Sequence, residues 1–251
     1  MRVFVINLVR RAERMEFMRL QFSRLGINFE RMEAIDGAAM PAREIEQSVN
    51  RFRWYCAQGY RARNGEIGCA LSHQLVYRKM IDENISAACI VEDDITLSPK
   101  FGEVAGEVGG FLSSAGDSPT VVLLSKSFQA AEHPSSGTCQ IYQVARENST
   151  CGYALNVAAA KRLLEINFPL KSTIDDWPRW RKRGGISLYG TLPRVCLHEE
   201  YASAPSNPAF ASDTIDENTV FVKDLPPLKK LFHKAKRVVG WTIDAVLPVW
   251  A

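Results

Sequence analysis

The sequence lacks any apolar run long enough to cross a membrane. A spanning helix needs about 18 or more consecutive apolar residues, whereas the N-terminal run, Val3 to Leu8, has six. Six residues are also too few for the core of a signal peptide. We therefore expect a cytoplasmic protein, or one that is bound to a membrane only at its surface.

Paired cysteine motifs are also missing. The six cysteines form no CxxC pair and show no His–Cys ligand spacing, and Cys89 lies within an apolar run. Scattered cysteines of this kind are typical of free thiols in a reducing compartment. We therefore expect buried free thiols and no disulfide framework.

Strong charge and a phosphate-binding loop are absent as well. The formal net charge of +3 is too small to predict a nucleic-acid partner, and no glycine- and lysine-rich phosphate loop is found. The missing loop argues against a metal-dependent nucleotidyltransferase. The 251 residues, 46% hydrophobic and 24% charged, are typical of an ordinary globular protein with a real core.

What the sequence does contain is an apolar run, Ala87 to Val91, that ends in three carboxylates, Glu92, Asp93 and Asp94. A short continuous apolar run is typical of a buried strand in a parallel sheet. Carboxylates this close repel one another unless a cation neutralises them. Because ligands of open α/β sheets bind beyond the carboxyl ends of the strands, the triplet is a candidate ligand site. A solvated strand-to-turn junction is the alternative.

The N-terminal segment predicts a β-α-β unit. Val3 to Leu8 is rich in β-branched and aromatic residues, and Arg11 to Leu25 places its apolar residues on one helical face. Ile27 to Ile35 is a second predicted strand, followed by the turn residues Asp36 and Gly37. Such a unit implies a parallel strand pair. We expect an α/β fold with a central, mostly parallel sheet.

Asn64 to His73 contains Gly65 and Gly68, which would let the backbone approach a ligand closely. Ser72 is predicted to cap a helix that runs from His73 to about Glu83. A helix N-terminus favours anions and lowers the pKa of a histidine, so a neutral His73 would donate to phosphate or sugar. A purely structural cap is the alternative for Ser72.

The C-terminal residues 223–251 have a different character. Lysines alternate there with apolar side chains, and Trp241 and Trp250 stand in the apolar end. A basic amphipathic segment lies well on an anionic membrane surface. A helix docked on the rest of the protein is the alternative.

Several motifs together resemble a known family. They are Asn7-Leu8 with Arg10 and Arg14, Asp36-Gly37, Gly65 to His73, Val91 to Asp94, and Gly152-Tyr153 before an alanine-rich helix. In this order they resemble glycosyltransferase family 25, which includes lipooligosaccharide galactosyltransferases of Gram-negative bacteria. The resemblance covers roughly residues 1–200. It implies a GT-A-like (Rossmann-type) nucleotide-sugar-binding domain over residues 1–222, with residues 223–251 as a tail.

The resemblance also implies a UDP-sugar donor, most often UDP-galactose, and a divalent cation, Mn²⁺ or Mg²⁺. By that analogy Asp94, with Glu92, is the expected metal ligand, and Glu92 or Asp93 would serve the ribose or a metal-bound water. His198 is a further candidate ligand, with a partly buried core histidine as the alternative. The chemistry agrees, because a cation held by carboxylates neutralises the charge that develops on a leaving diphosphate.

Four further residues are candidate donor contacts. Asn7 can hydrogen-bond a uracil or ribose edge, and Arg10 and Arg14 can reach a diphosphate with forked donors. Asp36 is at the height of a ribose or base contact. The alternatives are a solvated arginine for Arg14 and a plain turn residue for Asp36.

The acceptor hydroxyl requires a base, and Asp175 and Asp176 are the candidates. They precede a predicted helix, beside Trp177 and Trp180, whose faces can stack on sugar rings. A helix N-cap is the alternative for Asp176, and the choice between the two carboxylates stays open.

The resulting hypothesis is a metal-dependent, inverting galactosyltransferase that extends a lipid-linked oligosaccharide of lipooligosaccharide or lipopolysaccharide. It would sit peripherally on the cytoplasmic face of the inner membrane through its tail. The rival from another class is a non-catalytic saccharide- or nucleotide-sugar-binding protein on the same fold.

Overall fold

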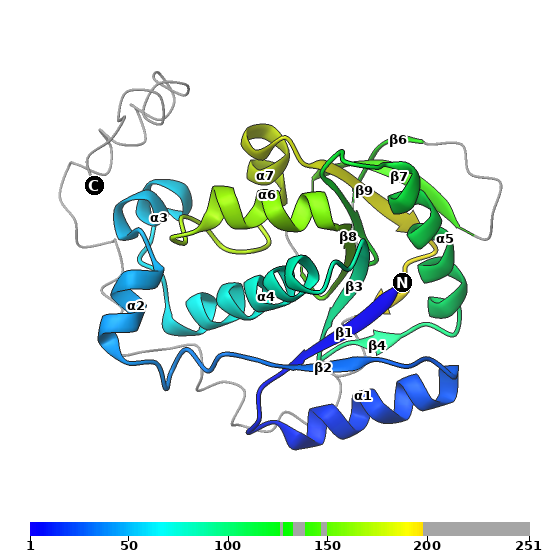
Figure 1. Cartoon of the computed structure of the whole chain (residues 1–251), viewed down its shortest axis with the longest axis horizontal. Helices are drawn as coiled ribbons and strands as arrows, with labels where there is room; N and C mark the ends of the chain where they lie inside the picture. Colours follow the sequence, from blue (N-terminus) through cyan, green and yellow to red (C-terminus); the bar gives the residue numbers. More distant parts are fainter. Residues whose placement is uncertain (126–127, 133–138, 147–149, 198–251) are drawn as a thin grey trace. The chain divides into compact units, whose positions relative to one another are not determined.

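The computed structural model describes residues 1–125, 128–132, 139–146 and 150–197 (Figure 1). The helices are α1 (Ala12–Leu25), α2 (Ala42–Ser48), α3 (Arg51–Gln58), α4 (Asn64–Asp82), α5 (Phe101–Ser114), α6 (Val157–Asn167) and α7 (Trp177–Gly184). The strands are β1 (Arg2–Asn7), β2 (Glu30–Glu33), β3 (Ala87–Glu92), β4 (Thr96–Leu97), β5 (Thr120–Leu123), β6 (Phe128–Glu132), β7 (Gln140–Arg146), β8 (Gly152–Asn156), β9 (Ser187–Leu192) and β10 (Cys196–Leu197).

Eight of these strands form one mixed sheet in the order β2-β1-β3-β8-β5-β9-β7-β6. β1 pairs parallel with both β2 and β3, and β5 pairs parallel with β9. β8 runs antiparallel between β3 and β5. The predicted α/β fold with a mostly parallel central sheet is therefore confirmed, and the arrangement is consistent with a GT-A-like fold.

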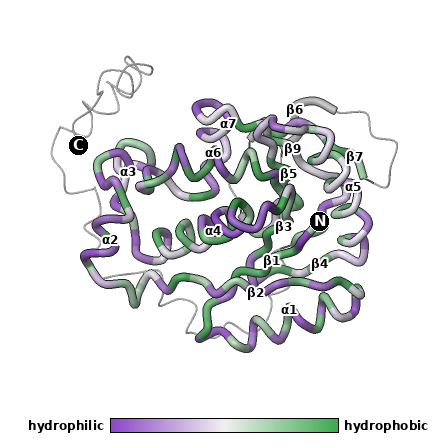
Figure 2. The backbone as a smooth tube through the Cα atoms, viewed as in Figure 1, coloured by the Kyte–Doolittle hydropathy of each residue, from purple (hydrophilic) through white to green (hydrophobic). Residues whose placement is uncertain are grey.

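Both faces of the sheet are buried, because neighbouring residues of a strand point to opposite faces. Phe4 and Ile6 of β1 pack with residues of α4, α6 and α7, whereas Val3 and Val5 pack with residues of α1 and α5. Figure 2 shows the hydrophobic residues gathered along the central strands. This two-sided burial explains why β1 and β3 appear in the sequence as continuous apolar runs.

The turn after β2 is the predicted one, and it fixes the position of α4. Ala38 N donates to Asp36 Oδ1 at 3.1 Å. A Cβ placed on Gly68 would lie 2.6 Å from the backbone N of Gly37 and 2.6 Å from the carbonyl O of Ile35. The helix and the turn therefore approach each other through bare backbone, which requires glycine.

The region before His73 corrects the sequence interpretation. Residues 40–63 contain two helices, α2 and α3, and α4 begins at Asn64, not at His73 as predicted. Glu66 stabilises this start, because its carboxylate accepts from Arg63 N at 2.9 Å and from the Tyr60 hydroxyl at 2.6 Å. Ser72 and His73 therefore lie inside α4, and the argument from a helix N-terminus does not apply to them.

Among the described helices, none is both long enough and apolar enough to cross a bilayer. The predicted tail, residues 223–251, and His198 lie outside the described residues. The predicted domain boundary at residue 222 and the membrane contact therefore stay predictions.

Candidate active site

The acidic triplet lies at the carboxyl end of β3, as expected. Glu92 is the last residue of the strand, and Asp93 and Asp94 form the turn that follows. Asp93 is held from two elements, because its Oδ2 accepts from Asn7 Nδ2 at 2.6 Å and its Oδ1 accepts from Arg14 Nη1 at 3.0 Å. Arg14 Nη1 also lies 3.5 Å from Asp94 Oδ2. The motif residues of β1 and α1 thus meet the triplet.

These contacts make Asp93 the anchored member of the triplet. Its side chain is buried, and burial raises its pKa above the usual range, although the hydrogen bonds from Asn7 and Arg14 act in the opposite direction. Asn7 is 1% exposed and donates a second hydrogen bond to Arg11 O at 2.9 Å. Its amide group is thus directed at protein atoms, and a nucleotide contact by Asn7 stays a prediction.

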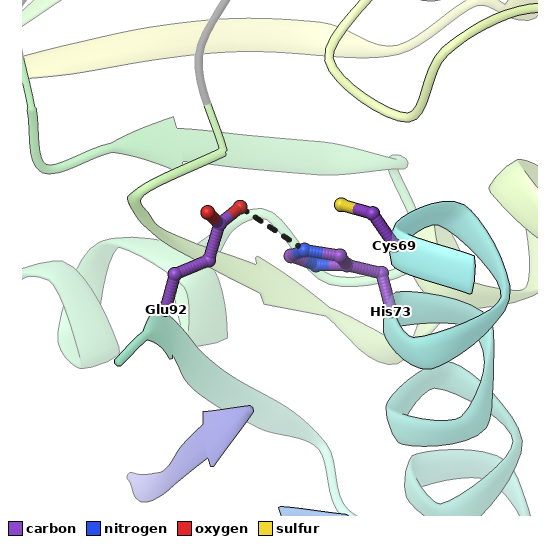
Figure 3. Close-up of side chains that lie close together, drawn as sticks. All are labelled: Cys69, His73 and Glu92. Atoms are coloured by element: carbon purple, nitrogen blue, oxygen red, sulfur yellow. Dashed lines mark ion pairs between the residues drawn. The ribbon is translucent and has the colours of Figure 1, made fainter. Parts of the chain in front are cut away.

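Glu92 faces a buried polar chain that the sequence did not reveal. His73 Nε2 lies 3.3 Å from Glu92 Oε1, and His73 Nδ1 lies 2.8 Å from the hydroxyl of Tyr153 (Figure 3). The Tyr153 hydroxyl in turn lies 2.6 Å from the Tyr77 hydroxyl. Thr150 donates from its hydroxyl to Glu92 Oε1. His73 is fully buried, so its ring is held by these neighbours at a fixed orientation.

Cys69 stands one helical turn before His73 and points toward the same carboxylate (Figure 3). Residues four apart on a helix share a face. Because α4 begins at Asn64, Cys69 and His73 have a ligand spacing of one helical turn, which corrects the prediction that no His–Cys ligand spacing exists. Burial and the charges of Glu92, Asp175 and Asp94 raise the pKa of the Cys69 thiol well above its usual value.

The candidate bases have different environments. Asp176 Oδ2 accepts from Arg179 Nε at 2.8 Å and from Ser172 Oγ at 2.5 Å, so this carboxylate is paired. Asp176 precedes α7 at the N-cap position, but its side chain makes no capping hydrogen bond. Burial, and then the charges of Glu92 and Asp176, raise the pKa of Asp175, while a hydrogen bond from Thr173 lowers it. Asp175 therefore lies within electrostatic reach of the triplet.

The two tryptophans beside these carboxylates are core residues, which corrects the expectation that their faces stack on sugar. Trp177 is fully buried and makes an edge contact with the ring of Tyr153 at a centroid distance of 5.2 Å. Trp180 is 3% exposed and donates from Nε1 to Ile174 O at 3.0 Å. Neither indole face is open to a ligand in this conformation.

Four other candidates lie in the segments after β1 and β2 and in α4. Arg10 Nε donates to Asp36 Oδ2 at 2.8 Å, which joins the segments that follow β1 and β2. Ser72 has a structural role, because its Oγ accepts from Ile35 N at 2.8 Å and donates to Gly68 O at 2.6 Å. Gly65 is in the first turn of α4, and a Cβ there would meet nothing within 4 Å.

The predicted ligand His198 is outside the described residues, but the strand before it is described. β10 pairs antiparallel with β4, and Leu197 is opposite Thr96. Thr96 comes two residues after Asp94 in the sequence. The chain therefore returns close to the acidic triplet at Leu197, and metal binding by His198 stays a prediction.

Comparisons with known proteins agree with this geometry. The family model of Glycosyltransferase family 25 (LPS biosynthesis protein) matches residues 1–177. A "Glycosyltransferase 25 family member" of Aedes aegypti is 30% identical over 233 residues, which is 85% of this chain and 38% of that protein. A "Putative glycosyltransferase" of Haemophilus influenzae is 28% identical over 250 residues, 93% of this chain and 84% of that protein.

A third relative is a "Procollagen galactosyltransferase 1" of Danio rerio, 25% identical over 178 residues, which is 68% of this chain and 29% of that protein. The chain spans 27% to 38% of the length of the insect relatives that it matches. The family match covers well over half of the chain, and the motifs that it includes are those that meet at the carboxyl edge of the sheet. The protein belongs to glycosyltransferase family 25.

Proposed function

We propose that the protein is a glycosyltransferase that moves galactose from UDP-galactose to a saccharide acceptor of lipooligosaccharide or lipopolysaccharide, with inversion at the anomeric carbon and with a divalent cation, Mn²⁺ or Mg²⁺. The donor hexose follows the names of the procollagen galactosyltransferases, and the acceptor follows the family description. Both are carried over by similarity.

The observation that carries the proposal is that residues from distant parts of the chain meet at the acidic triplet, where Asp93 accepts hydrogen bonds from Asn7 of β1 and Arg14 of α1. The charge of Glu92 raises the pKa of both Asp93 and Asp175, although these two come from different elements. Arg14 offsets part of this negative charge. A cluster of carboxylates favours a bound cation, and a carboxylate with a raised pKa is a suitable proton acceptor.

The donor set fits a hard divalent cation. Asp94 and Glu92 would hold it, with His198 as the predicted third ligand, because carboxylate oxygens are the ligands that Mg²⁺ and Mn²⁺ prefer. Asp93 fits less well, because both of its oxygens already accept hydrogen bonds from Asn7 and Arg14. When bound, the cation supplies neutralisation of the leaving diphosphate. Asp93 would act indirectly, by fixing the turn that carries Asp94.

Asp175 is the better candidate base. Its raised pKa makes the ionised carboxylate a stronger proton acceptor, and it lies within reach of the triplet's field. Asp176 is committed to Arg179 and Ser172. In this proposal Asp175 takes the proton of the acceptor hydroxyl as the oxygen attacks the anomeric carbon, while Asp176 holds the start of α7.

The proposed location is the cytoplasmic face of the inner membrane, where a lipid-linked acceptor would be presented. The support is the sequence of residues 223–251, in which basic side chains are interleaved with apolar ones. The tail would raise the local concentration of the enzyme at that surface. It is not required for the chemistry that we propose.

A donor screen tests the function. We expect release of UDP from UDP-galactose in the presence of Mn²⁺ and a truncated lipooligosaccharide acceptor, and loss of release with a chelator. Replacing the proposed base in Asp175→Asn should lower turnover by about 10²–10⁴-fold, and Asp94→Asn should lower it and raise the Mn²⁺ requirement. Asp117→Asn, at an exposed residue between α5 and β5, is the matched control.

Two outcomes would contradict the proposal. Metal-dependent binding of UDP-galactose without any UDP release across acceptors would favour the non-catalytic binding protein. Full activity of a folded Asp175→Asn variant would remove the base assignment, and if Asp176→Asn then lost activity the roles of the two carboxylates would be exchanged.

A further inference from the structure

Two side chains of α4 and the first carboxylate of the acidic triplet form a cluster with mixed ligand chemistry. The Sγ of Cys69, a ring nitrogen of His73 and a carboxylate oxygen of Glu92 all lie within 4.8 Å of one another. Cys69 and His73 come from successive turns of α4, and Glu92 comes from the end of β3 (Figure 3). A sulfur, a nitrogen and an oxygen thus converge from two rigid elements.

The buried histidine nitrogen points to a ligand. His73 Nε2 is buried and has no hydrogen-bond partner among the described residues, although it lies 3.3 Å from Glu92 Oε1. In a tetrahedral zinc site, nitrogen and oxygen ligands at about 2.0–2.1 Å from the metal stand about 3.3–3.4 Å apart. The observed distance, at which no hydrogen bond forms, thus matches the spacing expected for two ligands around one cation.

Both of these ligands have the outer partners that metal sites require. His73 Nδ1 lies 2.8 Å from the hydroxyl of Tyr153, whose oxygen can accept the proton of Nδ1. That tautomer leaves a lone pair on Nε2, toward Glu92. The hydroxyl of Thr150 donates to Glu92 Oε1 and holds the carboxylate in place.

Cys69 completes the cluster and gives it access to solvent. Part of the residue is exposed although the thiol itself lies among buried groups, so the cluster is next to solvent on that side. A sulfur ligand would stand about 3.6 Å from the nitrogen and oxygen ligands, and Cys69 Sγ already lies within 4.8 Å of both. The charges of Glu92, Asp175 and Asp94, which raise the pKa of the thiol, also attract a metal cation.

We propose that Cys69, His73 and Glu92 form a binding site for Zn²⁺ or a cation of similar softness, with a fourth position open to water. Thiolate and imidazole ligands select zinc over Mn²⁺ or Mg²⁺. Binding replaces the thiol proton by a metal–sulfur bond and releases that proton to solvent. The site shares Glu92 with the carboxylate site proposed for the donor cation, but its thiolate and imidazole ligands give it a different metal preference. Metal binding at this site does not depend on transferase activity.

Co²⁺ is the probe for this site, because a thiolate bound to Co²⁺ gives a charge-transfer absorption and tetrahedral Co²⁺ gives intense visible bands. We expect metal-free full-length protein to bind one Co²⁺ with both signatures, and Zn²⁺ to displace it. Cys69→Ser should remove the thiolate band, and Glu92→Gln should weaken Co²⁺ binding by about tenfold or more. Cys56→Ser, at a half-buried cysteine of α3, is the matched control and should keep both signatures.

Absence of a thiolate band in the wild-type protein would overturn the proposal, and so would a band that survives in Cys69→Ser. Loss of the band in Cys56→Ser would assign the thiolate elsewhere and would also overturn it. Cys69 is exposed, so its serine variant is expected to fold, and far-UV circular dichroism checks this. A protein that binds Co²⁺ as described but releases no UDP would refute the proposed function alone.

Discussion

Asn7 offers a quantitative test of how the acidic triplet is held. Its Nδ2 donates to the buried carboxylate of Asp93 at 2.6 Å and to Arg11 O at 2.9 Å. A hydrogen bond to a charged group contributes about 1.5–3 kcal/mol and a neutral one about 0.5–1.5 kcal/mol. Asn7 Oδ1 is buried without a hydrogen-bond partner among the described residues. Removing this unsatisfied oxygen is stabilising and offsets part of the free energy lost with the two hydrogen bonds. For Asn7→Leu we expect a loss near the lower limit, about 2 kcal/mol at pH 7.

The loss should depend on pH, and its sign follows from Asp93. Burial raises the folded-state pKa of Asp93 above its ordinary value, and the hydrogen bond from Asn7 counteracts that rise. Asn7→Leu therefore raises this pKa further. Between the unfolded and folded pKa values the native state binds more protons than the unfolded state, so stability falls as pH rises. The stability of Asn7→Leu therefore falls over a wider pH range than that of the wild-type protein. The difference in stability between the two should grow from acidic pH toward neutrality.

Urea unfolding, followed by tryptophan fluorescence from about pH 4 to pH 8, measures this deficit. Gln21→Met is the matched control, because buried Gln21 donates to Ile95 O at 2.9 Å and accepts from Leu97 N at 2.7 Å without touching a charge. Its deficit should be similar in size and constant with pH. An Asn7→Leu deficit that is equally constant would refute the view that Asn7 stabilises ionised Asp93.

Four further outcomes are expected. Gly68→Ala should destabilise the protein by about 1–3 kcal/mol in thermal unfolding, because a Cβ would meet backbone atoms at 2.6 Å. Gly65→Ala, where a Cβ meets nothing within 4 Å, should be neutral or slightly stabilising. Equal effects of the two substitutions would contradict the packing argument. Ser72→Ala should cost about 1–2 kcal/mol and leave the affinity for UDP unchanged, and a selective loss of UDP affinity would reassign Ser72 to the donor site. Turnover should rise with pH through the raised pKa of Asp175, and a flat profile would argue against that base. Deleting residues 224–251 should abolish binding to anionic liposomes but spare activity on a soluble acceptor; unchanged liposome binding would remove the membrane role of the tail.

Local patterns were sufficient to predict the parallel half of the fold. β1 and β3 are buried on both faces, so their apolar runs are visible in the sequence, and the carboxylates that follow β3 lie at the sheet edge as expected. Asp93 contacts Asn7 and Arg14 because β1 is next to β3 in the sheet. Asn7 ends β1, and Arg14 lies in the helix that follows.

The start of α4 could not be predicted from local patterns. Gly65 and Gly68 suggested a loop, but Gly68 is needed for contact with the turn at Gly37, which is distant in sequence. This error moved the helix start by nine residues, from His73 to Asn64, and concealed the one-turn spacing of Cys69 and His73. Tyr153, the partner of His73 Nδ1, comes from β8, whose antiparallel place in the sheet leaves no local signal.

The reversed direction of β8 has a consequence for how family members can diverge. Because β8 runs against β3, Thr150, two positions before the first residue of β8, reaches Glu92 at the edge where the parallel strands finish. The acidic motif can therefore be retuned by a substitution in a connecting segment that no motif includes. Two relatives with identical acidic residues could then differ in metal preference or turnover, and the cause would lie one strand away from the signature by which they were grouped.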